Sequence, residues 1–174
     1  DGGLGFTFKW DMGFMHDTID YMSLDPYFRS GSHSKLTFSM MYAFNENYIL
    51  PVSHDEVVHG KATILQKMNG DYEGKFPQCR ALTLYMYAHP GKKLNFMSNE
   101  IAQFAEWDYK KGVEFFLRLY PIHQKFSDCV KELNHLYKNT PALYEIEDSW
   151  DGFEWLAADD ADKNFIAYQR KDRA

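Results

Sequence analysis

The chain has 174 residues, which is enough for one sizeable hydrophobic core and a small second unit. A formal net charge of −6 without any block of basic residues argues against nucleic acid and anionic membranes as partners. The apolar runs are far shorter than the roughly 20 residues of a membrane-spanning helix, so we expect no membrane partner.

The ends of the chain and its cysteines bear on its origin and compartment. The chain starts at Asp1 without a methionine or a signal-peptide pattern, and we expect a piece of a longer protein. Cys79 and Cys129 fall in helix-like segments and make no disulfide framework. We therefore expect two buried free thiols in a reducing compartment, by default the cytoplasm.

The first part of the chain predicts a strand followed by a helix. Residues 5–11 alternate and are rich in aromatic side chains, which favours a strand. Residues 12–22 are rich in methionine and prone to form a helix, which Asp25-Pro26 ends. The apolar run at 36–42 fits either a helix or a strand.

The middle of the chain continues with strand, helix and strand. Residues 48–52 form a short apolar run, typical of a parallel strand that is buried on both faces. Residues 76–87 predict a helix and residues 94–97 a second buried strand. Polar residues follow each strand, as in parallel α/β sheets, which carry their chemistry at the carboxyl ends of the strands.

The last part changes its periodicity. Residues 114–120 and 126–137 predict two helices. Residues 153–157 and 165–169 then alternate and predict an antiparallel hairpin. We expect a domain boundary near residue 145.

The segment Ser53-His54-Asp55-Glu56 carries the strongest functional signal. Charged residues directly after a buried strand must be solvated, paired or functional, because burying them unpaired is costly. One interpretation is a structural cluster of ion pairs. Another is carbohydrate chemistry, in which a carboxylate and a histidine hydrogen-bond sugar hydroxyls and stabilise charge at the anomeric carbon.

A metal site is the third interpretation. Glu56 and His59, like Glu132 and His135, have the Glu-x-x-His spacing of di-iron carboxylate bundles. Those bundles need four long helices. The run ahead of Glu56 contains Pro51, which is unfavourable inside a helix, so one of the four is missing. The spacing also arises easily by chance, so we expect no metal ion.

Residues 48–61, with the sequence YILPVSHDEVVHGK, form the most distinctive stretch. Further distinctive stretches are Gly3-Leu4-Gly5-Phe6 through Lys9-Trp10, Met12-Gly13, Tyr21-Met22 through Asp25-Pro26, Pro90-Gly91-Lys92-Lys93-Leu94, Phe96-Met97, Asn99-Glu100, Gln103, Glu106-Trp107 and Gly152-Phe153-Glu154-Trp155-Leu156. Together they resemble the glycogen branching enzymes of the α-amylase superfamily, in the right order and over nearly the whole chain.

This resemblance implies an α/β fold in two parts. Residues 1–144 would be the C-terminal portion of a (β/α)8 TIM barrel, and residues 145–174 the start of an all-β C-terminal domain. The strands near 5–11, 48–52 and 94–97 would be the last three strands of the barrel.

The resemblance also implies a function, the transfer of α-1,4-glucan chains to form α-1,6 branches by a retaining mechanism. That mechanism uses an aspartate nucleophile and a glutamate acid/base, both of which the family carries upstream of the part that resembles this chain. We therefore expect the isolated chain to be inactive, its partner to be α-glucan such as glycogen or amylose, and no cofactor to be needed.

Three consecutive residues become candidates by this resemblance. Asp55 is implied to bind the hydroxyls of the sugar at the cleavage point and to favour its distortion. His54 is implied to donate to the same sugar and to stabilise the transition state. Glu56 is a candidate substrate-binding residue, although support or ion pairing is an equal alternative.

Further candidates lie elsewhere in the chain. Trp10 and Met12 follow the first strand and are candidates to line the cleft. Trp107 either stacks on a sugar or belongs to the core. Glu100 ends a strand, and the resemblance makes it a supporting residue.

Two alternatives to a branching enzyme remain, a debranching or amylolytic hydrolase of the same superfamily and a non-catalytic glucan-binding module. In either case three strands cannot close an eight-stranded barrel. We therefore expect open sheet edges through which the chain self-associates.

Overall fold

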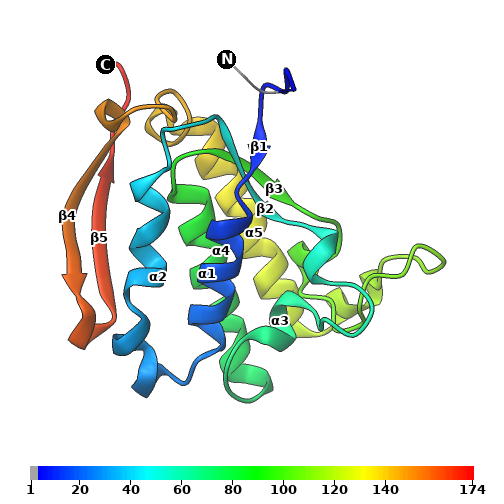
Figure 1. Ribbon diagram of the computed structural model, residues 1–174. Helices are drawn as coiled ribbons and strands as arrows, with labels where there is room; N and C mark the ends of the chain where they lie inside the picture. Colours follow the sequence, from blue (N-terminus) through cyan, green and yellow to red (C-terminus); the bar gives the residue numbers. More distant parts are fainter. Residues whose placement is uncertain (1–3) are drawn as a thin grey trace.

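A computed structural model describes residues 4–174 as an α/β protein with a parallel sheet, a helical layer and a C-terminal hairpin (Figure 1). Gly3, part of the first distinctive stretch, lies outside the described residues. The strands are β1 Lys9–Trp10, β2 Tyr48–Val52, β3 Lys92–Asn95, β4 Phe153–Asp160 and β5 Phe165–Arg170. The α-helices are α1 Met12–Ser23, α2 Ser34–Thr37, α3 Ile64–Lys67, α4 Tyr72–Ala88 and α5 Pro121–Asn139. The 3-10 helices are η1 Pro26–Ser32, η2 Phe38–Met41, η3 His54–Glu56, η4 Asn99–Ile101, η5 Phe115–Leu119, η6 Pro141–Leu143, η7 Trp150–Gly152 and η8 Ala161–Lys163.

β2 is the central strand of the parallel sheet β1-β2-β3. Trp10 of β1 lies opposite Ile49, and Asn95 of β3 lies opposite Val52. Leu50 and Val52 are buried in the main core, which the helices complete. The prediction of a parallel strand over residues 48–52 is confirmed, but its burial is complete only from Leu50 to Val52, since Tyr48 and Ile49 are partly buried.

The opposite face of the sheet is less covered. Successive side chains of a strand point to opposite faces, so Ile49 faces away from Leu50 and Val52. Ile49 is only partly buried, and its register neighbours Trp10 and Lys92 are exposed, whereas Pro51 on the same face is buried. The cover of this face is therefore incomplete around Ile49 and Trp10.

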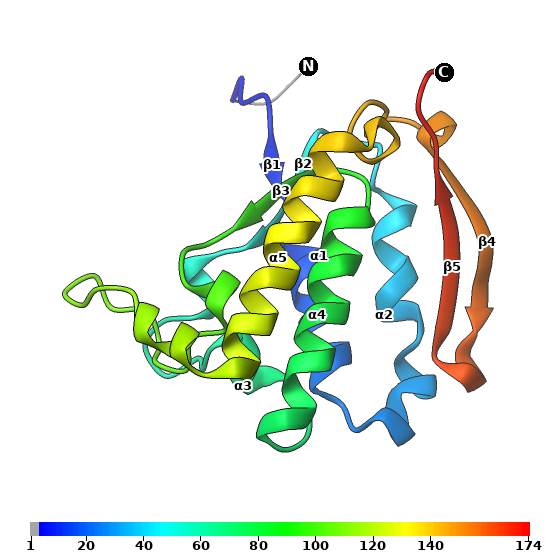
Figure 2. The same cartoon turned by 180° about the vertical axis from the view of Figure 1, so that it is seen from behind.

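The helices bury apolar side chains three or four residues apart, as an amphipathic helix requires. α1 begins after Asp11, whose carboxylate accepts the Phe14 N–H at 2.8 Å as an N-cap. α4 and α5 run side by side (Figure 2). Their Phe76 and Phe126 rings pack in the core with ring centres 6.2 Å apart. Across residues 4–174 no helix combines the length and the apolar character that a membrane crossing requires.

Several predicted helices need new limits. Residues 36–42, which fit either structure, fall in α2 and η2. α4 begins a turn earlier than expected because Asp71 caps it through the Gly74 N–H at 2.8 Å. The helix predicted over 114–120 is the short 3-10 helix η5, and the helix predicted from 126 already begins at Pro121 as α5.

Two strand predictions are also wrong in their limits. β1 is confined to two residues, because Asp11 already caps α1. β3 starts two residues before the expected 94–97 and includes Lys93, whose ammonium donates to the His89 carbonyl and lies 5.7 Å from the centre of the Tyr137 ring. A long lysine stem can cover a sheet while its head reaches polar groups, and this is what the apolar pattern missed.

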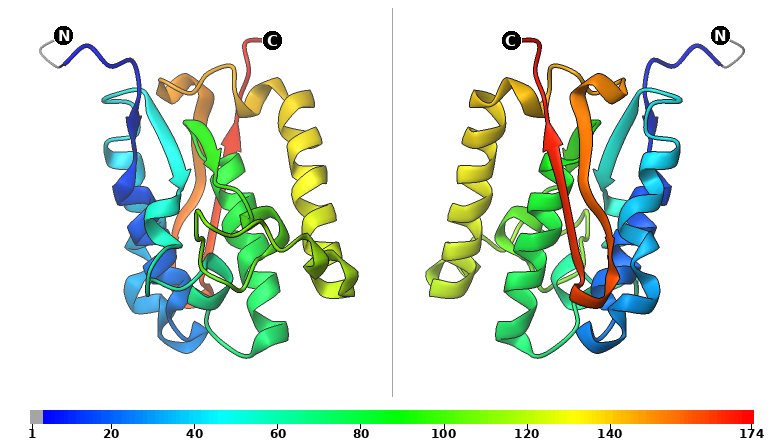
Figure 3. Two further views of the ribbon diagram at one scale, coloured as in Figure 1. Left: turned by 90° about the vertical axis from the view of Figure 1, so that its right-hand side faces the viewer. Right: turned by 90° about the vertical axis from the view of Figure 1, so that its left-hand side faces the viewer.

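The C-terminal hairpin β4-β5 is antiparallel, as predicted. Figure 3 shows it in front in the right-hand view, and Figure 1 shows it beside α2. Phe153 and Tyr168 stack with ring centres 5.0 Å apart and pack with Met40 in a small second core. His33 Nε2 and the Ala158 carbonyl, 2.9 Å apart, add a polar contact.

Both cysteines are free thiols, but their surroundings differ. Cys79 is buried in the core, and burial raises its thiol pKa to about 12. Cys129 is only half-buried at the margin of α5, so the expectation of a buried thiol is wrong for this residue.

Candidate functional site

The candidate site begins where β2 ends. Ser53 is buried, and the chain then turns through the 3-10 helix η3, which together with Ser53 we call the 53–56 turn. Asp55 accepts a hydrogen bond from Ser53 Oγ at 3.2 Å, and its other carboxylate oxygen lies 3.4 Å from His54 Nε2. The side chains of His54 and Asp55 remain 45% and 44% exposed. The pair is therefore oriented by local contacts and still open to a ligand.

Two aromatic rings flank this pair. The His54 ring centre lies 5.6 Å from that of Phe96 and 6.1 Å from that of Trp107. Phe96 and Trp107 meet edge to face at 5.4 Å, an arrangement that aromatic rings favour. The Trp107 N–H of the main chain donates to the Val57 carbonyl at 2.8 Å, which fixes this ring beside the turn. Imidazole, carboxylate and flat apolar rings thus share one surface.

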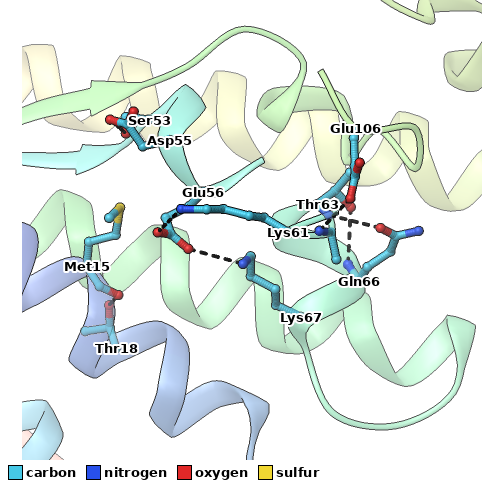
Figure 4. Close-up of polar contacts among 11 residues, drawn as sticks. Met15, Thr18, Ser53, Asp55, Glu56, Lys61, Thr63, Gln66, Lys67 and Glu106 are labelled. Atoms are coloured by element: carbon cyan, nitrogen blue, oxygen red, sulfur yellow. Dashed lines mark hydrogen bonds and ion pairs between the residues drawn. The ribbon is translucent and has the colours of Figure 1, made fainter. Parts of the chain in front are cut away.

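Glu56 has a different environment from its neighbour Asp55. Its side chain is only 11% exposed and lies between Lys61 Nζ at 3.4 Å and Lys67 Nζ at 3.2 Å (Figure 4). Both carboxylate oxygens are therefore engaged in ion pairs. The geometry matches the ion-pairing alternative for Glu56 more closely than a direct contact with substrate.

The loop after the turn has an unusual backbone. His59, Gly60 and Ala62 have φ values of 43°, 81° and 64°, in the left-handed region that disfavours side chains with a Cβ. Glu106 accepts the N–H groups of Gly60 and Ala62, both at 2.8 Å. We call these three residues the Glu106 clamp. Its two hydrogen bonds lower the pKa of the Glu106 carboxyl below its usual range, with smaller contributions from His59 and Lys67.

Trp10 and Met12 are less close to the 53–56 turn. Trp10 pairs with Ile49, four residues before Ser53, which corresponds to about 13 Å along the strand at its usual rise. Met12 is partly buried against the main core. Trp107 is thus the aromatic candidate that the structure brings to His54.

Glu100 lines a different hollow from the one near His54 and Asp55. It belongs to η4 and lines a hollow of about 560 Å³ beside β3, α4 and α5, together with Lys93 and Asn134. A different hollow, of about 420 Å³, lies beside Trp107 and is lined by His59 and Lys111 among others.

The Glu-x-x-His segments do not build a metal centre. Glu56 and His59 lie in a turn, where the left-handed His59 breaks helical spacing, and Glu132 and His135 are exposed on α5. Within residues 4–174, no three His, Cys, Asp or Glu side chains gather in a way that could hold a metal ion.

Two contributors were not assigned a role from the sequence, Phe96 and Glu106. A signal for Phe96 existed, because it follows β3 and so lies level with the residues that follow β2. The clamp by Glu106 has no such signal, since it joins loop residues more than 40 positions apart.

Comparison with known proteins gives a consistent result. No family model matches the chain. The chain is 49% identical over 172 residues to the 1,4-alpha-glucan branching enzyme of Halothermothrix orenii and 51% identical over 173 residues to that of Aquifex aeolicus. These matches cover 99% of this chain but only 27% and 28% of the two relatives. Nearly the whole chain is therefore homologous to a segment, about a quarter of the length, of the 1,4-alpha-glucan branching enzymes.

Proposed function

We propose that this chain is part of a 1,4-alpha-glucan branching enzyme and that its 53–56 turn contacts the glucan. The observation that carries the proposal is the half-exposed His54–Asp55 pair beside Phe96 and Trp107, in a chain about half identical to such enzymes. Sugar rings present hydroxyl groups at their edges and apolar C–H faces. A carboxylate, an imidazole and flat rings on one surface complement both.

Each member of the site has a role in this proposal. Asp55 accepts hydrogen bonds from the hydroxyls of the sugar at the cleavage point and so favours its distortion towards the transition state. His54 donates to the same sugar, and Trp107 stacks on a neighbouring ring. Glu56 keeps the turn in place through its two lysines rather than by touching glucan.

The rest of the enzyme supplies the bond-breaking groups. A retaining mechanism needs an aspartate that forms a glucosyl-enzyme and a glutamate that protonates the leaving oxygen. The glutamate then takes the proton of an acceptor glucan's 6-hydroxyl, whose oxygen displaces the aspartate from the anomeric carbon and makes the α-1,6 branch. We expect the isolated chain to be inactive, because the resemblance places this aspartate and glutamate upstream of the chain, whereas Asp55, oriented by Ser53 and close to His54, binds the sugar.

The same proposal extends to the fold. We infer that residues 1–144 belong to a (β/α)8 barrel, with β1, β2 and β3 as three successive strands, and that residues 145–174 open a β-domain. The parallel order of the strands and the incompletely covered sheet face around Ile49 support this inference. The outer edges of β1 and β3 would pair with further strands of the enzyme or, in the isolated chain, with a second copy.

The enzyme should act in the cytoplasm on α-glucan. The thiols of Cys79 and Cys129 support a reducing compartment. The net charge of −6 gives no attraction for nucleic acid, whereas a neutral glucan needs none.

A chimeric enzyme tests the proposal. The chain replaces the matching segment of the Aquifex aeolicus enzyme, and the products from amylose are analysed for α-1,6 linkages. New branches are expected, and a chimera carrying Asp55→Asn should make few. A folded chimera that only shortens amylose would favour a hydrolase, and one that binds glucan without reaction would favour a binding module.

A further inference from the structure

We propose that Glu106 is a positioning residue of the glucan site, because its carboxylate fixes the loop that forms one wall of the hollow beside Trp107. The inference rests on the proposed function and extends it to a residue that lines the hollow but acts mainly through the loop that its carboxylate holds. Both oxygens of Glu106 are already occupied by the N–H groups of Gly60 and Ala62.

The clamp stabilises a loop whose backbone conformation is unfavourable by itself. His59 and Ala62 carry side chains in the left-handed region, which costs each of them roughly 1–2 kcal/mol. Without an acceptor, the N–H groups of Gly60 and Ala62 would turn to water and the loop would lose its single conformation. Figure 4 shows Glu106 reaching this loop next to Thr63 and Gln66.

The segment around the clamp is fixed from both sides. After Ala62, Thr63 and Gln66 form a capping box that starts α3, with hydrogen bonds of 3.0 and 3.3 Å. Before His59, the Val57 carbonyl accepts the main-chain N–H of Trp107 at 2.8 Å. The hydrogen bonds of Glu106 to Gly60 and Ala62 fall between these two fixed points and join the loop to the segment that carries Trp107.

The clamp also shapes a surface of the right chemistry. The hollow of about 420 Å³ is lined by Trp107 and Phe104, and its polar members are His59, Gln66, Glu106, Asp108 and Lys111. Rings and hydrogen-bonding groups in one hollow suit an α-glucan chain that continues beyond the sugar bound by Asp55. A loosened loop would therefore weaken glucan binding more than it would slow the chemical step.

The test uses the chimera with Glu106→Gln. The amide keeps the shape of the side chain but offers one acceptor where two N–H groups need two. Amide hydrogen exchange of residues 58–63 should become about tenfold faster, as expected for the loss of one charge-assisted hydrogen bond. For amylose, KM should rise about tenfold while kcat stays within about threefold.

Controls separate this role from a general loss of structure. Glu132→Gln changes an exposed carboxylate on α5 and should leave exchange and KM unchanged. If the glutamine variant exposes α4 amides as well, Glu106→Asp carries the test, because it keeps the charge but is too short to reach both N–H groups.

The outcomes are distinct. Unchanged exchange at residues 58–63, or faster exchange with an unchanged KM, would overturn the positioning role. An inactive wild-type chimera would remove the proposed function and this role with it, whereas the exchange measurement would still decide whether the clamp exists.

Discussion

Two regions of the molecule treat charged side chains in opposite ways, the 53–56 turn and the contacts of Arg170. Arg170 donates to the carbonyls of Gly152 at 3.0 Å, Ala88 at 2.9 Å and Ile146 at 3.0 Å. We call these four residues the Arg170 joint, which ties the hairpin to the end of α4. At the turn, His54 and Asp55 instead keep nearly half of their surface exposed.

Exposure and pairing separate a charge that holds the structure from one that remains free to bind. A guanidinium whose three nitrogens each donate to a main-chain carbonyl is committed to the structure and has little to offer a ligand. Gly152 of the joint cannot be replaced by a larger residue without a shift of the backbone, since a Cβ there would lie 2.2 Å from the Ile146 carbonyl oxygen. A half-exposed carboxylate with free lone pairs costs little stability and can bind. We expect substitutions in the two regions to affect different measurements.

The largest effect on stability should come from the joint. Arg170→Met removes one donor from each of three main-chain carbonyls and leaves those of Ala88 and Ile146 without the guanidinium, which should destabilise the chain by about 3 kcal/mol. Arg80→Met, on the exposed side of α4, is the matched control and should have little effect. Urea unfolding of the three proteins measures both. Equal stability of all three would show that the hairpin does not depend on the joint.

The pH dependence of stability should come from the same end of α4. Burial, and then the positive charges of Lys93 and Arg170, hold the pKa of His89 well below 6.5. The unfolded chain therefore takes up the proton first, and stability falls as pH decreases below 6.5, by about 1.4 kcal/mol per pH unit. His89→Gln should flatten the curve of melting temperature against pH between 5 and 7. The exposed His16→Gln should not, and a slope unchanged by His89→Gln would contradict this assignment.

A smaller effect on stability is expected at Glu56. This residue lies in the 53–56 turn, but its carboxylate is held by ion pairs in the way that Arg170 is held by carbonyls. Glu56→Gln leaves Lys67 without its carboxylate and should cost about 1–2 kcal/mol of stability. Glu132→Gln, exposed on α5, is again the control. In the chimera the activity should follow the stability. Loss of activity from a fully stable Glu56→Gln chimera would instead make Glu56 a substrate contact.

The sequence predicts features that depend on neighbours along the chain. The run from Tyr48 to Val52 predicts β2, and the polar residues after it predict the turn, because both follow from local pattern and strand order. The apolar pattern misses Lys93 in β3, since it cannot show where a long side chain ends.

Contacts between distant segments could not be predicted in this way. Glu106 meets Gly60 and Arg170 meets Ala88 only because the fold brings separate loops together. Local sequence holds no information on such pairs, and a carboxylate in a clamp looks like any surface glutamate. The residues with the strongest local signal therefore became candidates for the site, whereas the roles of Glu106 and Arg170 had no such signal.

The central claim is that Asp55 binds the reacting sugar while Glu56 beside it supports the turn. The most direct measurement is kcat of the chimera with Asp55→Asn, together with its melting temperature. We predict that kcat falls about 100-fold to 1,000-fold, as for the loss of a hydrogen bond that strengthens in the transition state, with the melting temperature unchanged. A stable Asp55→Asn chimera that keeps wild-type kcat would contradict the account.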